Sequence, residues 1–229
     1  MFPYRDNLVA GGRAWAVVTL VVFLSVINLP LFVLESWHSA AITALGFYPL
    51  RFSLHPLVDS YTLITASGLH GDIFHLAGNC LFLVVFGRTL ERLLGSAPLL
   101  VLFPALGVVG FLLHWGFYPD SPVPVIGSSG AVAALMGAYF PLFPRARIRM
   151  VAFFGLFWKR FTVPAWVFLP YWGGLQLFSL VFGSQDGVAY AVHTGSFAAG
   201  ALAAIVWKTS YPFADEKLVI FNATSFDAA

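Results

Sequence analysis

The stretch Ile126-Gly127-Ser128-Ser129-Gly130-Ala131 places two serines where a proline-rich loop gives way to an apolar segment that runs to Phe143. We expect a helix to begin here, where backbone N–H groups lack intrahelical partners and carry partial positive charge. Such a position stabilises an alkoxide or an oxyanion, so it suits a nucleophilic serine. The alternative is that either serine only caps the helix, while Gly127 and Gly130 let neighbouring helices approach closely.

The composition identifies the solvent of this chain before any motif is considered. Of 229 residues, 59% are hydrophobic and 10% are charged, and the mean hydropathy is +0.85. A soluble domain could not hide this much apolar surface, so we expect membrane lipid around the protein. A net charge of +2, scattered along the chain, gives no indication of a nucleic-acid partner. The single cysteine, Cys80, excludes an intrachain disulfide and a cysteine-based metal cluster.

Six apolar runs are long enough to cross about 30 Å of hydrocarbon. We therefore predict an all-α polytopic membrane protein, with a six-transmembrane helical bundle at 14–208, an N-terminal segment at 1–13 and a tail at 209–229. The fourth run is the shortest, as expected for a central helix that its neighbours shield from lipid. The predicted spans are about 14–35, 73–94, 97–117, 127–143, 165–183 and 188–208.

The basic residues predict the orientation of this bundle. If the N-terminus is cytoplasmic, eleven of the twelve lysines and arginines fall in inner segments, and Arg51 alone falls outside. Since basic residues favour cytoplasmic loops, we expect both termini in the cytoplasm of a multi-pass protein, in the plasma (inner) membrane as the simplest case. The outer connection at 36–72 is too broken to span and should pack on the outer rim of the bundle.

Polar side chains inside membrane helices are candidates for function because they are costly there. His75 and Asn79 are four residues apart on one face of the second span, Ser129 lies at the start of the fourth, and His193 lies near the start of the sixth. These three spans all enter from the outer side, so the four side chains should lie at one depth. Each alone could be only a hydrogen-bonded interhelical group.

The chemistry that suits this set is acyl transfer. A histidine can act as general base toward a serine hydroxyl, while a second histidine, an asparagine and the backbone N–H of Ser129 could hold an oxyanion. No carboxylate lies at this depth, so we expect a Ser-His dyad without a third acidic member. We expect no cofactor and no metal, because a site formed by His70, His75 and His193 would lack the usual acidic or thiol ligands.

Several motifs together resemble the rhomboid family of intramembrane serine proteases over about 60–208. They are His70-Gly71-Asp72-Ile73-Phe74-His75-Leu76-Ala77-Gly78-Asn79, Glu91-Arg92-Leu93-Leu94-Gly95, Gly127-Ser128-Ser129-Gly130, and the run from His193 to Gly200. The resemblance implies a serine-type endopeptidase with Ser129 as nucleophile, His193 as base, and His75 and Asn79 as oxyanion donors. It also implies substrates that are single-pass or polytopic membrane proteins, cut near the outer ends of their transmembrane segments.

The chain departs from the common family pattern at three places. Ser60-Tyr61 replaces a Trp-Arg pair, Ala133 replaces an aromatic residue that stacks on the catalytic histidine, and Gly195-Ser196 alters the small-residue spacing after His193. With Ala133 in place, Tyr190 or Tyr139 is left to orient His193. Two other functions stay open: a catalytically inactive rhomboid-like protein that binds membrane helices, and a transporter or proton relay using His75 and His193.

Overall fold

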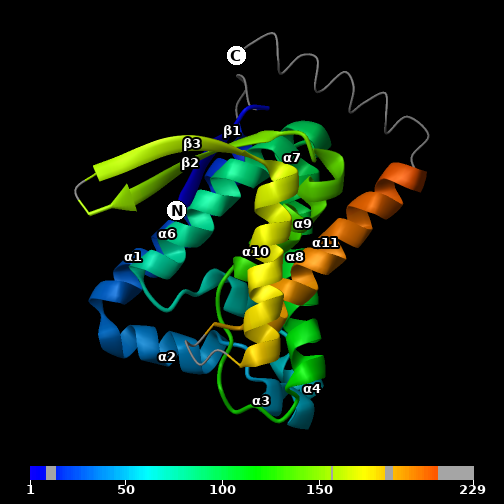
Figure 1. Cartoon of the computed structure of the whole chain (residues 1–229). Coiled ribbons are helices and arrows are strands. Elements are labelled where there is room, and N and C mark those ends of the chain that lie inside the picture. The colour runs from blue at the N-terminus through cyan, green and yellow to red at the C-terminus, as the bar shows by residue number, and fades with distance from the viewer. Residues whose placement is uncertain (9–13, 156, 184–187, 211–229) are drawn as a thin grey trace.

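The structure, a computed structural model, describes residues 1–8, 14–155, 157–183 and 188–210 (Figure 1). Within them, five helical segments are long and apolar enough to cross a membrane. One of these, Ile73–Leu94, consists of α6 (Ile73–Phe82), a π-helical turn at Leu83–Gly87 and α7 (Arg88–Leu94). The others are α1 (Trp15–Val33), α8 (Ser96–Phe117), α10 (Ala165–Phe182) and α11 (Tyr190–Ser210).

The remaining apolar helix, α9 (Ser129–Leu142), occupies the centre of the bundle. Ten of its 14 residues are buried, so its neighbours enclose it on most sides. Small residues allow this packing: a methyl group at Gly137 would overlap the backbone carbonyl of Phe197, and one at Gly200 would overlap that of Ala134. The backbones of α9 and α11 are therefore in direct contact, which fixes the start of α9 relative to the start of α11.

Acidic side chains near the helix ends act as structural anchors. Asp72 caps α6, since its carboxylate accepts hydrogen bonds from the backbone N–H groups of Phe74 and His75. The carboxylate of Glu91 in α7 accepts hydrogen bonds from the backbone N–H groups of Ala16 and Val17, with N···O distances of 2.7 and 2.9 Å. These bonds hold the first turn of α1. The motif that includes Glu91 thus has a clear packing role.

The prediction of an all-α chain is wrong at one end of the bundle. There β1 (Phe2–Asp6), β2 (Arg147–Phe154) and β3 (Phe157–Pro164) form an antiparallel sheet in the order β1-β2-β3. The reason is a period of two in β2, where Ile148, Met150 and Ala152 are buried and the residues between them are more exposed. The sequence analysis predicted no strand in this stretch, which lies between the fourth and fifth predicted spans.

The N-terminal segment is also more than a tail before the first helix. Its strand β1 pairs with β2, and the buried carboxylate of Asp6 accepts hydrogen bonds from the hydroxyls of Thr89 and Tyr139. The segment is therefore tied to the bundle through a strand pairing and a buried polar cluster. Residues 9–13 and 211–229, which include most of the predicted tail, lie outside the described residues.

The connection after α1 forms short helices at the end of the bundle opposite the sheet (Figure 1). Phe47 packs on Phe111 of α8 and on Phe52, and Arg51 forms an ion pair with Asp59. The loop is thus docked without the Trp-Arg pair that Ser60-Tyr61 replaces. Its helices are α2 (Glu35–Leu45), α3 (Pro49–Leu54), α4 (Pro56–Asp59) and α5 (Thr62–Thr65).

Candidate active site

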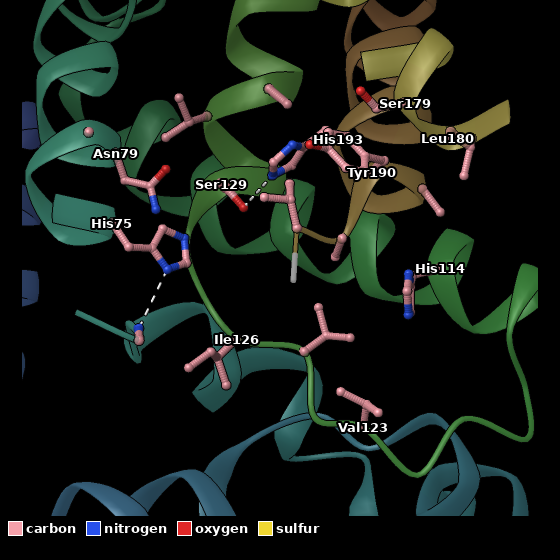
Figure 2. A pocket seen from close by; sticks show the side chains of 18 of the residues that line it. His75, Asn79, His114, Val123, Ile126, Ser129, Ser179, Leu180, Tyr190 and His193 are labelled. Atoms are coloured by element: carbon pink, nitrogen blue, oxygen red, sulfur yellow. Dashed lines mark hydrogen bonds between the residues drawn. The ribbon is translucent and has the colours of Figure 1, made fainter. Parts of the chain in front are cut away.

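The helices α6, α9 and α11 all begin at the end of the bundle opposite the sheet (Figure 1). Ser129 is the first residue of α9, His193 is the fourth of α11, and His75 and Asn79 are the third and seventh of α6. Figure 2 shows these four side chains around one open cavity of about 1000 Å³. The structure therefore brings together all four residues that the sequence analysis singled out.

Ser129 and His193 are in hydrogen-bond contact across α9 and α11. The Ser129 Oγ lies 2.8 Å from the Nε2 of His193, although 64 residues separate them in the sequence. Ser129 lies in the first turn of α9, where backbone N–H groups have no intrahelical acceptor. A hydroxyl, an imidazole and free N–H donors thus meet at one point of the cavity, which is the arrangement that acyl transfer requires.

The other side of the His193 ring is held by α10. Its Nδ1 lies 2.7 Å from the Oε1 of Gln176, and the Trp172 ring lies near its face with centroids 6.0 Å apart. Tyr190 contacts it edge-on at 6.4 Å. Tyr139, the other tyrosine considered for this role, instead donates its hydroxyl hydrogen to Asp6, so that prediction is wrong. Because an amide oxygen can only accept, the proton of a neutral His193 is placed on Nδ1.

Asn79 and His75 offer donors to the cavity on the side facing α6. The Nδ2 of Asn79 has no hydrogen-bond partner, although the side chain is only 8% exposed. The Nδ1 of His75 accepts the backbone N–H of Gly71 at 3.4 Å, which leaves the proton on Nε2. A Cβ at Gly127 would lie 2.8 Å from His75 Nε2, so glycine lets the chain pass close to these donors.

Ser128, the neighbour of Ser129, has a different environment. It is fully buried, its Oγ lies 3.2 Å from the Nε2 of His70, and it makes no side-chain cap, so the capping alternative is wrong for this residue. The backbone of His70 is fixed by two hydrogen bonds: its N–H donates to the side chain of Asn28, and its carbonyl accepts from the ring of His38. Burial lowers the pKa of His70 from 6.5 to about 3, so its imidazole stays neutral near pH 7.

Three polar residues within apolar runs contribute to this region but were missed in the sequence analysis. Gln176 bonds to His193, Asn28 holds the loop at 68–70 through Gly68 and His70, and His114 lines the cavity. A signal was available, because each interrupts a predicted span with a polar side chain, and in-membrane polar groups need partners. Among the described residues, no cluster of three histidine, cysteine or acidic side chains could hold a metal ion.

Comparison with known proteins places this site in a family context. The family model for the rhomboid domain matches residues 58–209, which include all four site residues. The chain is 31% identical over 144 residues to the rhomboid-family protein YdcA of Bacillus subtilis, covering 61% of this chain and 68% of YdcA. It is 35% identical over 96 residues to the rhomboid protease GluP of the same organism.

These alignments differ in how much of each relative they include. The match to GluP covers 42% of this chain but only 18% of GluP. A match to rhomboid protein 1, mitochondrial, of Saccharomyces cerevisiae has 30% identity over 156 residues and covers 64% of this chain and 41% of that protein. The chain therefore spans less than half the length of two of these three relatives.

Proposed function

Since the chain belongs to the rhomboid family, we propose that it is an intramembrane serine endopeptidase that cuts transmembrane-segment substrates near the outer membrane face. The observation that carries this proposal is the 2.8 Å contact between Ser129 Oγ and His193 Nε2 at the start of a buried helix. An inactive, helix-binding member of the family would have no chemical need for this contact.

The first step is attack by Ser129 on the scissile carbonyl. With its Nδ1 proton donated to Gln176, His193 presents an unprotonated Nε2 to the serine hydroxyl and accepts its proton. The resulting imidazolium then gives that proton to the leaving amine as the peptide C–N bond breaks. A water molecule, activated by the same Nε2, attacks the acyl-enzyme and releases the second product.

The second requirement is stabilisation of the tetrahedral oxyanion. We assign this role to the backbone N–H of Ser129 and to the side chains of Asn79 and His75, which face the same cavity. The unpartnered Nδ2 of Asn79 supports the assignment, because a buried donor without an acceptor is costly unless a ligand or water supplies one. Donors fixed before the reaction need no rearrangement when negative charge develops.

The proposed orientation places both termini and the sheet in the cytoplasm and the cavity toward the outer side. In this arrangement α9 is the fourth of six spans, short because other helices surround it. We propose the plasma (inner) membrane as the location, although relatives in this comparison include mitochondrial proteins. The substrates are then single-pass or polytopic membrane proteins whose helices reach the cavity from the lipid phase.

The test is labelling of the detergent-solubilised protein with a mechanism-based serine-hydrolase probe, together with cleavage of a model transmembrane substrate. Wild type should be labelled and active, Ser129→Ala should be neither, and Ser128→Ala should keep a good part of both. Activity should persist in EDTA, since no metal has a role. Absence of labelling and cleavage in folded wild type would favour the inactive, helix-binding alternative, and labelling that survives Ser129→Ala would overturn the assignment of the nucleophile.

A further inference from the structure

The hairpin of β2 and β3 changes from buried to exposed along its length. Ile148, Met150 and Ala152 are at most 3% exposed where the sheet covers the bundle. Farther along, the aromatic side chains become exposed: Phe153 by 61%, Phe157 by 81% and Trp158 by 56%. Figure 1 shows this part of the hairpin projecting sideways beyond the helix ends. Large apolar side chains gathered in this way indicate a surface that another phase or partner covers.

The position of the hairpin identifies which phase that is. Strand β3 ends at Pro164, and α10, a candidate membrane span, begins at the next residue. The hairpin therefore lies at the level where a helix enters the membrane. Because its outer part extends beyond the bundle, that part lies above lipid and not above protein. Aromatic side chains are favoured at this headgroup level.

The charges on the hairpin indicate the kind of lipid. No acidic residue occurs between Asp120 and Asp186. None of the five cations in the hairpin or just before it is within ion-pair distance of a carboxylate in the described part of the chain, and all five are exposed. One of them, Arg160, lies with its guanidinium carbon 4.7 Å from the centre of the Trp158 ring. The five are Arg145, Arg147, Arg149, Lys159 and Arg160.

We propose that the hairpin tip, defined as Phe157 and Lys159 on the face of the sheet that is turned to the bundle, is an interfacial anchor that binds anionic phospholipid headgroups. The Phe157 ring enters the headgroup region, and Lys159 contacts the lipid phosphates. Phe157 and Lys159 share the sheet face of Ala152, which faces the bundle and hence the lipid beside it. The anchor would bind lipid whether or not the chain is a protease.

The first experiment measures the depth of the tip in a bilayer. An environment-sensitive fluorophore is attached at Phe157→Cys in the full chain with Cys80→Ser, in nanodiscs of phosphatidylcholine and phosphatidylglycerol. The matched control is Thr162→Cys, an exposed residue on the opposite face of the same strand. We expect lipids brominated in their acyl chains to quench the probe at 157 and to leave the probe at 162 unaffected. Equal quenching at both positions, or none at 157, would overturn the proposal.

The second experiment measures lipid preference by native mass spectrometry of the detergent-solubilised chain. Lys159→Gln should lower phosphatidylglycerol retention relative to phosphatidylcholine by roughly fivefold, since each cation near an anionic surface adds several-fold. Arg160→Gln removes the same charge from the opposite face of the strand and should have a smaller effect. Equal losses of phosphatidylglycerol retention in the two variants would indicate a diffuse charge effect and contradict the proposed anchor. Displacement of the lipid by inorganic phosphate would indicate a site for a soluble anion and also contradict the proposal.

Discussion

The Nδ1 of His193 lies 2.7 Å from the Oε1 of Gln176, so the imidazole is held between α10 and the hydroxyl of Ser129. A neutral amide fixes which ring nitrogen carries the proton, as a carboxylate would. Unlike a carboxylate, it adds no negative charge beside the imidazolium that forms during catalysis. The proposed catalytic unit is therefore a Ser-His dyad with an amide positioning residue, and its geometry depends on α10.

Replacement of Gln176 by leucine should lower kcat about ten- to a hundredfold and leave KM nearly unchanged. The reason is that the substitution leaves the Nδ1 proton of His193 without an acceptor, at a cost of about 1–3 kcal/mol. Steady-state cleavage of a model substrate measures both constants. Gln176→Glu restores an acceptor and should recover part of the activity. A rise in KM alone would indicate that Gln176 contacts substrate and does not position the histidine.

Replacement of Asn79 by alanine should lower kcat about a hundred- to a thousandfold, because an oxyanion donor acts mainly in the transition state. The melting temperature should hardly change, since the Nδ2 of Asn79 has no partner to lose. Asn28→Ala is the matched control, because Asn28 bonds to Leu24, Gly68 and His70 and should lose stability. If Asn79→Ala raised KM with kcat intact, Asn79 would be a substrate-binding or packing residue.

The buried His70 should make the stability of the fold depend on pH. The pKa of His70 is about 3 in the folded protein, against an ordinary value of 6.5 for histidine. Below pH 6.5 the unfolded chain therefore binds a proton that the folded one does not. The contribution of His70 to the free energy of unfolding is fully present above pH 6.5. It declines as the pH falls toward 3, and at pH 5 it is lower by about 2 kcal/mol.

Thermal unfolding in detergent at pH 7.5 and 5.0 tests this dependence. His70→Gln should be less stable than wild type at pH 7.5 but should lose less between the two pH values. The comparison with wild type separates the contribution of His70 to the pH dependence from that of the other five histidines. An identical pH dependence in both proteins would mean that His70 does not titrate on unfolding.

Replacement of Gly137 or Gly200 by alanine should destabilise the bundle by about 1–3 kcal/mol or more and abolish activity. Each methyl group would overlap a backbone carbonyl of the facing helix, so α9 and α11 must separate and draw Ser129 away from His193. Gly174→Ala in α10 is the control, because its methyl group meets nothing within 4 Å. The thermal midpoint should fall for the first two and stay or rise for the control. Full activity in Gly200→Ala would contradict the tight α9–α11 contact.

The orientation in the membrane can be measured with single cysteines in a Cys80→Ser chain. A cysteine at Asp120 should react with an impermeant thiol reagent applied outside intact cells, while one at Arg147 should react only after the cells are opened. Both residues are exposed, so burial does not explain a difference between them. The opposite pattern would place the sheet outside and the cavity inside.

The sequence alone determined the membrane class, the family and the helices that carry the site. A long apolar run directly indicates a membrane-spanning helix, because each apolar residue in it favours lipid over water. The described helices accordingly begin and end within a few residues of the predicted spans. Ser129, His193, His75 and Asn79 could be selected because each lies near the start of its helix, and the starts of alternate spans share one side of a membrane.

Only the tertiary structure decided what holds these residues in place. Gln176 is 17 residues from His193, Ser128 is 58 from His70, and Tyr139 is 133 from Asp6. The rotation of each helix about its axis selects these partners, and that rotation depends on close packing such as Gly137 against Phe197. The sheet was decided in the same way: local residues allow a strand at 147–154, but β1 and β3 are needed to pair its backbone.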